Sequence, residues 1–288
     1  MELKKIAKVL LSCVLVGALF TACGGGEGGD KPGNNYSYKE CTVGILTHLN
    51  STEESMGEVL TNIEEETGAK ERIYKPKFFD SLKLMQLGIE SGKVEEVSIY
   101  KSVAEYLVAN NDKFEIVKRD ALDKIEYNFH FAVRKDDEQL KNDFDKALSE
   151  MKADGTLDKF LNDYVTNVDK GQTPPKVEIP KVEGAQTIKV GVTGDLPPLD
   201  LVLADNTPAG FNTAILAEIA KRSGKNIELV QIETGARAAA LKSKLIDVIF
   251  WVVVPLSDKI SADIDTPEGL KLTAPYFKDN LAGIKLKK

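Results

Sequence analysis

The sequence of 288 residues predicts an α/β protein whose strands pair largely in parallel. Short apolar runs alternate with amphipathic runs of helical period, which is the pattern of strands connected by helices. Two such segments flank a proline-rich connector at residues 166–186, expected to be an extended linker. Composition agrees, because 42% apolar and 29% charged residues are typical of a globular protein.

Before the connector, the pattern predicts strands at residues 42–47, 94–99 and 127–133, and helices at residues 52–66, 80–91, 102–109, 136–152 and 156–164. The helix at 136–152 shows the signal most clearly. Its apolar side chains recur at three- and four-residue spacing and share one face: Leu140, Phe144, Leu148 and Met151. Gly155 follows as a stop residue.

After the connector, the pattern predicts strands at residues 187–192, 227–232, 247–253 and 281–286, and helices at residues 212–223 and 236–242. Ligands of open α/β sheets bind beyond the carboxyl ends of the strands. We therefore expect ligand contacts in the loops at residues 194–199 and 251–255 of this segment, and at residues 47–52 and Tyr100 of the preceding one.

Residues 1–22 are predicted to be an export signal. Lys4, Lys5 and Lys8 precede an apolar run at residues 9–20 that is too short to span a bilayer. Such a signal is removed from the mature protein and is not part of the fold.

The end of the signal, Phe20-Thr21-Ala22-Cys23, resembles the lipobox of bacterial lipoproteins. The resemblance implies cleavage before Cys23 and a diacylglycerol on its sulfur. The alternative is a soluble secreted protein in which Cys23 is incidental. Residues 23–40 are rich in glycine and predict a flexible tether. Cys41 follows beside an apolar run and is expected to be a buried thiol.

Charge and cysteine content exclude several classes. The formal net charge is −7 and no basic block follows residue 22, so we do not expect nucleic-acid binding. Three cysteines without paired spacing and only two histidines, His48 and His130, support neither a zinc site nor a disulfide framework. No acid–base pair or catalytic triad is evident, so we expect no enzyme activity and no cofactor.

Several motifs resemble known proteins. Those after the connector, at residues 188–198, 210–212, 217–220 and 244–249, are similar to the first lobe of bacterial extracellular solute-binding proteins of family 3, and residues 272–277 resemble that family's crossover to its second lobe. Those before it, at residues 42–45, 87–97, 131–137 and 152–159, resemble the second lobe. The resemblance implies a two-lobed periplasmic-binding-protein-like fold with a ligand cleft between the lobes.

The order of the two lobes is reversed relative to that family. We therefore interpret the chain as a circular permutant, which is tolerated where old termini lie close together. Its predicted parts are the second lobe at 41–126, a hinge strand and closing helices at 127–165, the linker at 166–186, the first lobe at 187–280 and a hinge strand at 281–288. The alternative is a broken tandem of two incomplete receptors, which would favour domain-swapped dimers rather than the expected monomer.

The resemblance implies a receptor held by its lipid on the extracytoplasmic face of the cell membrane, which passes a small solute to an ABC permease. Family members hold amino acids with an Arg and an Asp, whose positions fall here on Lys259 and Tyr100. The family's small and hydroxyl positions fall on Val252, Val254 and Leu256. The usual amino-acid site is therefore not expected. The alternative function is a ligand-sensing or scaffold lipoprotein that does not serve transport.

Four side chains are predicted to line the cleft from the strand ends and the following helix. Trp251 would stack on a planar ligand, or else it is a core or hinge residue. Arg237 would meet an anionic group, or else it is a surface arginine at a helix start. Tyr100 and Thr47 are expected to be wall residues.

The remaining candidates have plainer alternatives. Asn50, Ser51 and Thr52 precede a helix and either bind ligand or cap that helix. Asp195 either contacts ligand or caps the turn before Pro197, which we favour. Two further wall residues complete the predicted site: Leu196 and Val252.

Overall fold

The computed structural model describes residues 39–66, 72–119, 121–167, 169 and 171–288. The predicted signal, Cys23 and nearly all of the predicted tether lie outside these residues.

Ten strands form one sheet: β1 (Lys39–Leu46), β2 (Arg72–Phe79), β3 (Glu96–Tyr100), β4 (Phe114–Val117), β5 (Glu126–Arg134), β6 (Thr187–Val192), β10 (Asn226–Gln231), β11 (Val248–Pro255), β12 (Leu270–Leu272) and β13 (Phe277–Leu286). Three short strands form a second: β7 (Asp195–Leu196), β8 (Asp200–Val202) and β9 (Pro208–Ala209).

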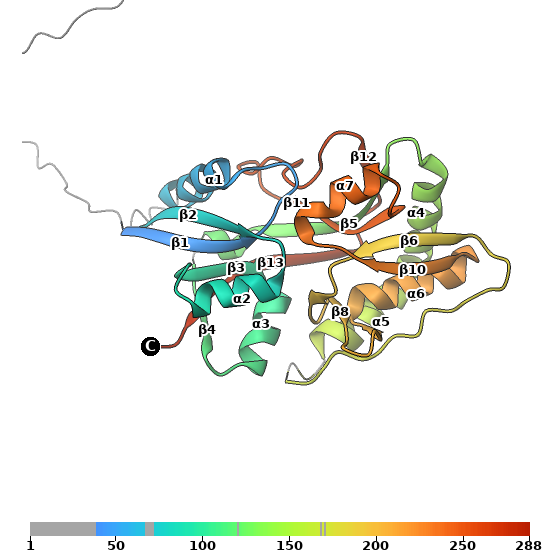
Figure 1. Cartoon of the computed structure of the whole chain (residues 1–288), viewed down its shortest axis with the longest axis horizontal. Coiled ribbons are helices and arrows are strands. Elements are labelled where there is room, and N and C mark those ends of the chain that lie inside the picture. Colours follow the sequence, from blue (N-terminus) through green and yellow to red (C-terminus); the bar gives the residue numbers. More distant parts are fainter. Residues whose placement is uncertain (1–38, 67–71, 120, 168, 170) are drawn as a thin grey trace, which may run out of the picture. The chain divides into compact units, whose positions relative to one another are not determined.

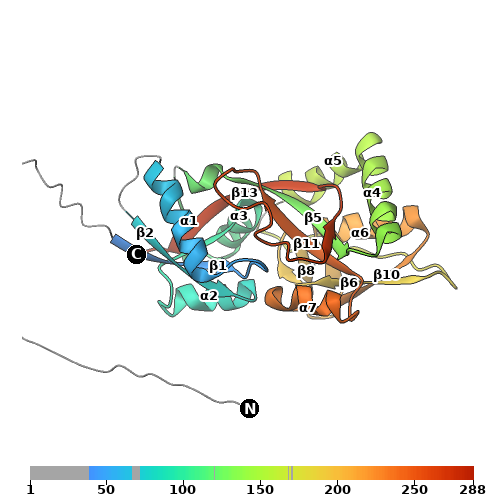
Figure 2. The same ribbon diagram turned by 90° about the horizontal axis from the view of Figure 1, so that it is seen from above.

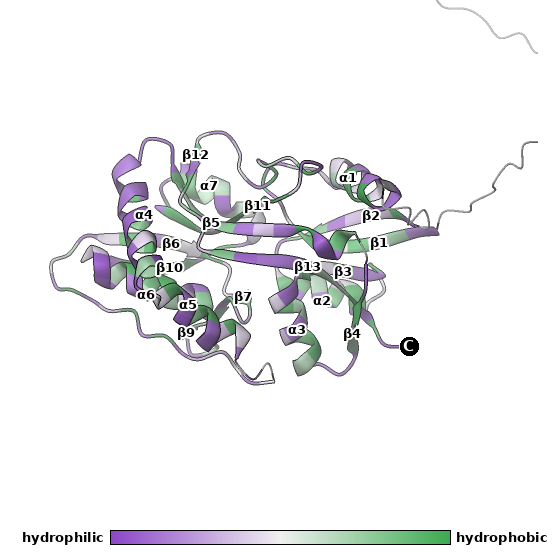
Figure 3. Cartoon of the chain, turned by 180° about the vertical axis from the view of Figure 1, so that it is seen from behind, coloured by the Kyte–Doolittle hydropathy of each residue, from purple (hydrophilic) through white to green (hydrophobic). Residues whose placement is uncertain are grey.

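The α-helices are α1 (Glu53–Glu66), α2 (Leu82–Glu90), α3 (Lys101–Asn110), α4 (Glu138–Ala153), α5 (Thr156–Leu161), α6 (Phe211–Ser223) and α7 (Arg237–Lys242). Their outer and inner faces differ in hydropathy, as Figure 3 shows for α4 and α6. In the part of the chain that the structure describes, no helix combines the length and apolarity needed to cross a bilayer.

The large sheet has two halves, and five strands are arranged in the same way in each half (Figure 1). One half has the order β2-β1-β3-β13-β4, and the other has β10-β6-β11-β5-β12. In each half the first three strands are parallel and the fourth, β13 or β5, is antiparallel to its neighbours. We call strands β1–β4 with α1–α3 the β1 lobe, and strands β6–β12 with α4–α7 the β6 lobe.

Strands β5 and β13 connect the lobes by pairing with each other (Figure 2). Glu126 pairs with Asn280, and Phe129 pairs with Phe277. The later part of β5 joins the β6 lobe by pairing with β11 and β12, while β13 from Leu281 onward joins the β1 lobe. Strand β13 thus begins earlier than the strand predicted at 281–286, and the segment shared by both lobes is 277–280.

The sequence prediction missed strands β2, β4 and β12 and the small sheet. Strand β2 contains Pro76, which cannot donate to a sheet ladder, yet it lies at the edge of the sheet, where the missing N–H is tolerated. The helix predicted at 156–164 ends as α5 at Leu161 and continues as a π turn, Asn162–Thr166. The other predicted helices and strands form within a few residues of their expected bounds.

An aromatic core follows the two connecting strands. The ring centres of Phe129 and Phe277 lie 5.1 Å apart, and those of Phe131 and Tyr276 lie 4.5 Å apart in a stacked arrangement. Tyr100, at the end of β3, adds an edge contact to Phe129 at 4.7 Å. These rings are all buried, so one apolar core spans the junction of the lobes.

The described part of the linker lies against the β6 lobe. The Val177 amide donates to the Pro208 carbonyl (2.9 Å), and the Gly210 amide donates to the Pro175 carbonyl (3.2 Å). Farther along, Asn226 exchanges two hydrogen bonds with the Val182 backbone, at 2.7 and 2.9 Å. These hydrogen bonds fix the described linker residues along one lobe, and the linker's extended form stays a prediction.

Cys41 is a buried thiol, which confirms the prediction. It lies on β1 and is 5% exposed. Burial, with the nearby Glu96 carboxylate, raises its thiol pKa to about 12. It is therefore protonated and unreactive at neutral pH.

Candidate functional site

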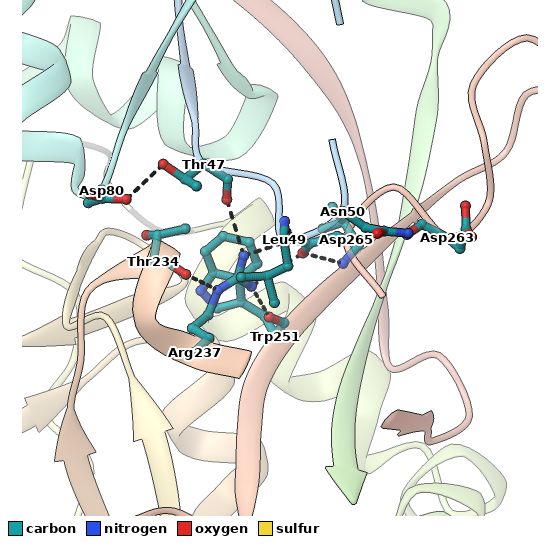
Figure 4. A network of polar contacts seen from close by, with 10 residues as sticks. Thr47, Leu49, Asn50, Asp80, Thr234, Arg237, Trp251, Asp263 and Asp265 are labelled. Carbon is teal, nitrogen blue, oxygen red and sulfur yellow. Dashed lines mark hydrogen bonds and ion pairs between the residues drawn. The ribbon is translucent and has the colours of Figure 1, made fainter. Parts of the chain in front are cut away.

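The two lobes meet where the strands of both end. Loops after β1 and β2 contact loops after β10 and β11 there, and Arg237 lies at the centre (Figure 4). Arg237 begins α7, and its side chain is 1% exposed. The alternative of a surface arginine is therefore wrong.

The guanidinium of Arg237 reaches three backbone carbonyls. Its Nε donates to the Thr234 carbonyl (2.8 Å), its Nη1 to the Trp251 carbonyl (2.5 Å) and its Nη2 to the Thr47 carbonyl (3.3 Å). The first two carbonyls belong to the β6 lobe and the third belongs to the β1 lobe. Arg237 thus connects the lobes directly.

Trp251 lies beneath this cation. The guanidinium carbon of Arg237 is 4.1 Å from the centre of the Trp251 ring, and Tyr100 meets the ring edge-on at 6.0 Å. Trp251 is 2% exposed and belongs to the main core. It is therefore a core residue at the lobe contact, which is one of the two alternatives considered for it, and stacking on a ligand stays a prediction.

Thr47 and Tyr100 contribute from the β1 lobe. The Thr47 hydroxyl donates to the Asp80 carboxylate at 2.8 Å. Tyr100 is buried, and burial holds its phenol pKa well above the usual value, so it is neutral at physiological pH. The structure brings both to the lobe contact, as the strand-end argument predicts.

Asp195 crosses between the lobes. Its carboxylate accepts hydrogen bonds from the amides of Leu82 (2.8 Å) and Lys83 (3.4 Å), in the first turn of α2. Burial raises its pKa. The prediction that Asp195 caps its own turn needs correction, because that turn is organised by Asp200.

Asp200 is fully buried beneath the loop after β6. Its carboxylate accepts from the Thr193 amide (2.9 Å), the Thr193 hydroxyl (2.9 Å) and the Gly194 amide (3.0 Å). Burial raises its pKa to about 6. Sequence reasoning missed this residue, because its donors stand earlier in the chain, outside the usual turn spacing.

The three residues before α1 differ in their contacts. Thr52 is the cap of α1, because its hydroxyl accepts from the Ser55 amide at 3.1 Å. Asn50 contacts the other lobe, since its amide donates to the Ile264 carbonyl at 2.9 Å. Ser51 is half-buried, and its hydroxyl has no partner among the described residues.

Leu196 and Val252 have packing roles. Both are 0% exposed. Leu196 belongs to the main core, whereas Val252 belongs to a smaller one with Ala132 and Leu241. Neighbouring residues on a strand point to opposite faces, so Val252 faces away from the side that Trp251 occupies.

The cation at the lobe contact is not the one at the family's arginine position. Lys259 is exposed, in the loop after β11. Of the two positions aligned with hydroxyls, Val254 is half-buried and Leu256 is exposed. The charge that reaches the junction is that of Arg237.

Asp265 is the site residue that sequence reasoning missed. It is 0% exposed, and its Oδ1 lies 2.9 Å from Nη2 of Arg237, 28 positions earlier in the chain. Asp80 was also missed; its backbone carbonyl accepts from the Thr234 amide at 3.0 Å across the lobes. No local pattern marks either residue, because Asp265 reaches Arg237 only through the folding of the β6 lobe, and Asp80 reaches Thr234 only where the two lobes meet.

One small cavity lies within the β1 lobe, beside Tyr100. The cavity bordered by Tyr100 and His48 measures about 20 Å³, roughly the room of one water molecule. A much larger groove, of about 1010 Å³, lies between the linker and β10. Within the described residues, no group of three His, Cys, Asp or Glu side chains could hold a metal ion.

The fold and this junction define a two-lobed α/β binding protein. The chain matches the family model of bacterial extracellular solute-binding proteins, family 3, over residues 45–167 and 188–254. Because the match covers more than half of the chain, the protein belongs to this family, which confirms the resemblance found in the sequence.

One curated relative is a probable histidine-binding protein of Campylobacter jejuni. It is 33% identical over 103 residues, which are 35% of this chain and 36% of the relative. The chain thus matches only about a third of that relative's length.

Solved structures with a similar arrangement include a ligand-binding component of an ABC-type import system from Staphylococcus aureus, with zinc bound. Its TM-score is 0.43 at 10% identity, over 85% of this chain and 65% of that one. A putative methionine-binding lipoprotein from Bacillus subtilis has a TM-score of 0.41 at 11% identity, over 86% of this chain and 83% of that one.

Proposed function

We propose that this protein binds a small organic solute between the β1 lobe and the β6 lobe and delivers it to an ABC permease. Family membership supports a solute-binding role. The observation that carries the proposal is a pair of buried polar atoms beside Arg237. Trp251 Nε1 and Thr234 Oγ1 have no hydrogen-bond partner among the described residues. Buried polar groups are ordinarily paired, so these two suit a polar ligand.

The polar contacts between the lobes come from loops and helix starts, not from paired strands. The direct interlobe hydrogen bonds run between short loops, such as Thr234 to Asp80 and Arg237 to Thr47. Among the described residues, the paired segments of β5 and β13, at residues 126–129 and 277–280, are the strands that continue through both lobes. Rotation about two connecting strands is a common way to open a ligand site.

The proposal is tested by thermal melts against amino acids, peptides and aromatic or acidic solutes. A solute at 100 times its Kd should stabilise the protein by about 2.7 kcal/mol. Trp251 is the only tryptophan, so binding at the junction should also change the protein's tryptophan emission. An unchanged melting temperature across a broad library would contradict the proposal.

Two variants of cationic residues locate the site. Arg237→Lys keeps the charge but loses the planar fork, so solute affinity should fall. Lys259→Ala, at the exposed family position, should leave affinity unchanged. If instead Lys259→Ala abolishes binding and Arg237→Lys does not, the site lies outside this junction.

The second candidate function is a ligand-sensing or scaffold role without transport. It is favoured by the exposure of Lys259 at the family's arginine position. Uptake of the bound solute separates the two. Loss of uptake on deletion of the gene supports transport, whereas unchanged uptake supports the sensing role.

We also propose that lipid on Cys23 holds the protein at the extracytoplasmic face of the membrane. The lipobox-like sequence supports this. Cys23→Ala should release the protein from membranes or block its processing. Cys41→Ala is the matched control and should leave membrane fractionation unchanged, since Cys41 is a buried thiol of the fold.

Circular permutation is our proposal for the chain order. The two halves of the sheet have the same strand order, and the linker stays on the β6 lobe. The start of β1 and the C-terminus lie at the same end of the β1 lobe (Figure 1), so a short join can restore the usual order. A chain that starts at residue 187, continues from residue 288 to residue 39 and ends at residue 167 should fold as a monomer. An obligatory dimer in light scattering would favour the broken tandem.

A further inference from the structure

A short segment between β11 and β12 reaches the β1 lobe. We call residues 261–266 the strap. Its turn is closed by two backbone hydrogen bonds, from Ile264 to Ser261 (3.1 Å) and from Thr266 to Asp263 (2.8 Å). Asn50 of the β1 lobe attaches to it twice, through its amide to the Ile264 carbonyl (2.9 Å) and through Nδ2 to the Asp263 carbonyl (3.1 Å). Figure 2 shows the dark red loop that contains the strap approaching α1.

The strap places the carboxylate of Asp265 among four N–H donors. Arg237 approaches it with Nη2 at 2.9 Å from Oδ1 and Nη1 at 3.3 Å from Oδ2. The Leu49 amide donates to Oδ1 (2.9 Å), and the Val253 amide donates to Oδ2 (3.2 Å). Both oxygens are satisfied, by a fork-shaped cation and by one amide from each lobe.

This arrangement uses every donor of Arg237. An arginine has five N–H groups, and the three carbonyls and two carboxylate contacts already described account for all five. Arg237 is 1% and Asp265 is 0% exposed. A carboxylate from outside can therefore take this position only if Asp265 leaves it.

We infer that the junction is a carboxylate site whose ligand in the closed protein is Asp265 itself, so that the strap closes the lobes and competes with an external carboxylate. The four donors recognise a carboxylate group and nothing specific to aspartate. An entering solute would exchange one carboxylate for another at Arg237 and release the strap to water. This inference uses the proposed function only to name the competitor; the internal contact stands without it.

The test removes the internal carboxylate and supplies it again as a small molecule. Asp265→Ala should open the lobes, with a larger radius of gyration in solution scattering and a red shift of Trp251 emission. Formate should reverse both changes, because it restores a carboxylate to the vacated donors. Formamide, which has the same shape without the charge, and sodium chloride should not.

Asp263→Ala is the matched control. Asp263 is an exposed residue of the same strap whose side chain accepts a hydrogen bond from Ser261. Its variant should keep the scattering and emission of the wild type and should not respond to formate. Formate should likewise leave the scattering and emission of the wild type unchanged over the concentration range that closes Asp265→Ala.

Two outcomes overturn the inference: an Asp265→Ala protein with wild-type scattering and emission, or an open one that formate closes no better than formamide. If Asp265→Ala does not fold, Asp265→Asn keeps the side-chain shape and should still open the lobes. A flat solute library together with rescue by formate would reject the proposed function and support the internal ligand.

Discussion

Two carboxylates of the β6 lobe hold the β1 lobe, and their surroundings differ. Asp195 is half-buried and accepts from two amides at the start of α2. Asp265 is fully buried and adds the guanidinium of Arg237 to its two amide donors. A carboxylate that keeps part of its hydration can rely on backbone donors, whereas one removed from water needs a paired cation or a proton.

Asp200 is the third member of this comparison. It is fully buried like Asp265, but its donors are two amides and a hydroxyl. Burial raises its pKa to about 6, so Asp200 can take up a proton where Asp265 pairs with a cation. Burial without a paired cation shifts the carboxylate toward its protonated form.

The largest expected effect comes from removing the cation of the buried pair. Arg237→Met leaves Asp265 without its charge partner and three carbonyls without donors. We expect a loss of about 3–5 kcal/mol in the free energy of unfolding, measured by urea denaturation. Adding Asp265→Leu should recover most of it, since the unpaired charge is then absent. A double variant as unstable as the single one would contradict this account of the pair.

The intermediate effect concerns Asp200 and pH. Its folded pKa of about 6 lies above the unfolded value of 3.8, so the folded state binds the proton first as pH falls. Asp200 therefore adds stability as pH falls from about 7 to about 4, and this stability is lost as pH rises through about 6. Relative to Asp200→Asn, the wild type should gain on the order of 1–3 kcal/mol over this range.

Unfolding of both proteins at pH 4, 5, 6 and 7 measures that difference directly, because the other titrating groups cancel. A difference that does not change with pH would mean that Asp200 remains charged despite its burial.

The smallest effect concerns the helix that both lobes cap. The Ser81 hydroxyl caps α2 from within the β1 lobe, accepting from the Leu84 amide, and Asp195 adds its carboxylate from the other lobe. Ser81→Ala and Asp195→Ala should each cost about 0.5–2 kcal/mol. Only Asp195→Ala should also shift solution scattering toward an open form. Equal scattering of the two variants would show that Asp195 does not hold the lobes.

The sequence predicted the parts of this protein that depend on neighbouring residues. The α/β class, nearly all helices and the cap at Thr52 follow from short-range periodicity and capping patterns, and the family motifs identified the family. The strand-end rule also predicted that Trp251, Tyr100 and Thr47 share one junction, whereas the sequence left Arg237 either at that site or on the surface. Strand β2 was missed because Pro76 argues against a strand in the sequence pattern. The strand forms by pairing with β1, which the local sequence does not indicate.

The pairing of charges was decided only by the tertiary structure. Arg237 and Asp265 are 28 positions apart, and Asp195 and Leu82 are 113 apart. Neither pair has a spacing that a helix or turn would bring together. The first pair forms within the β6 lobe and the second between the two lobes. The first makes Arg237 a buried ion-pair partner rather than the surface residue that its helix start suggests. The burial of Arg237 and the pairing of its charge with Asp265 arise only in the folded junction. A local sequence pattern therefore cannot indicate either of them.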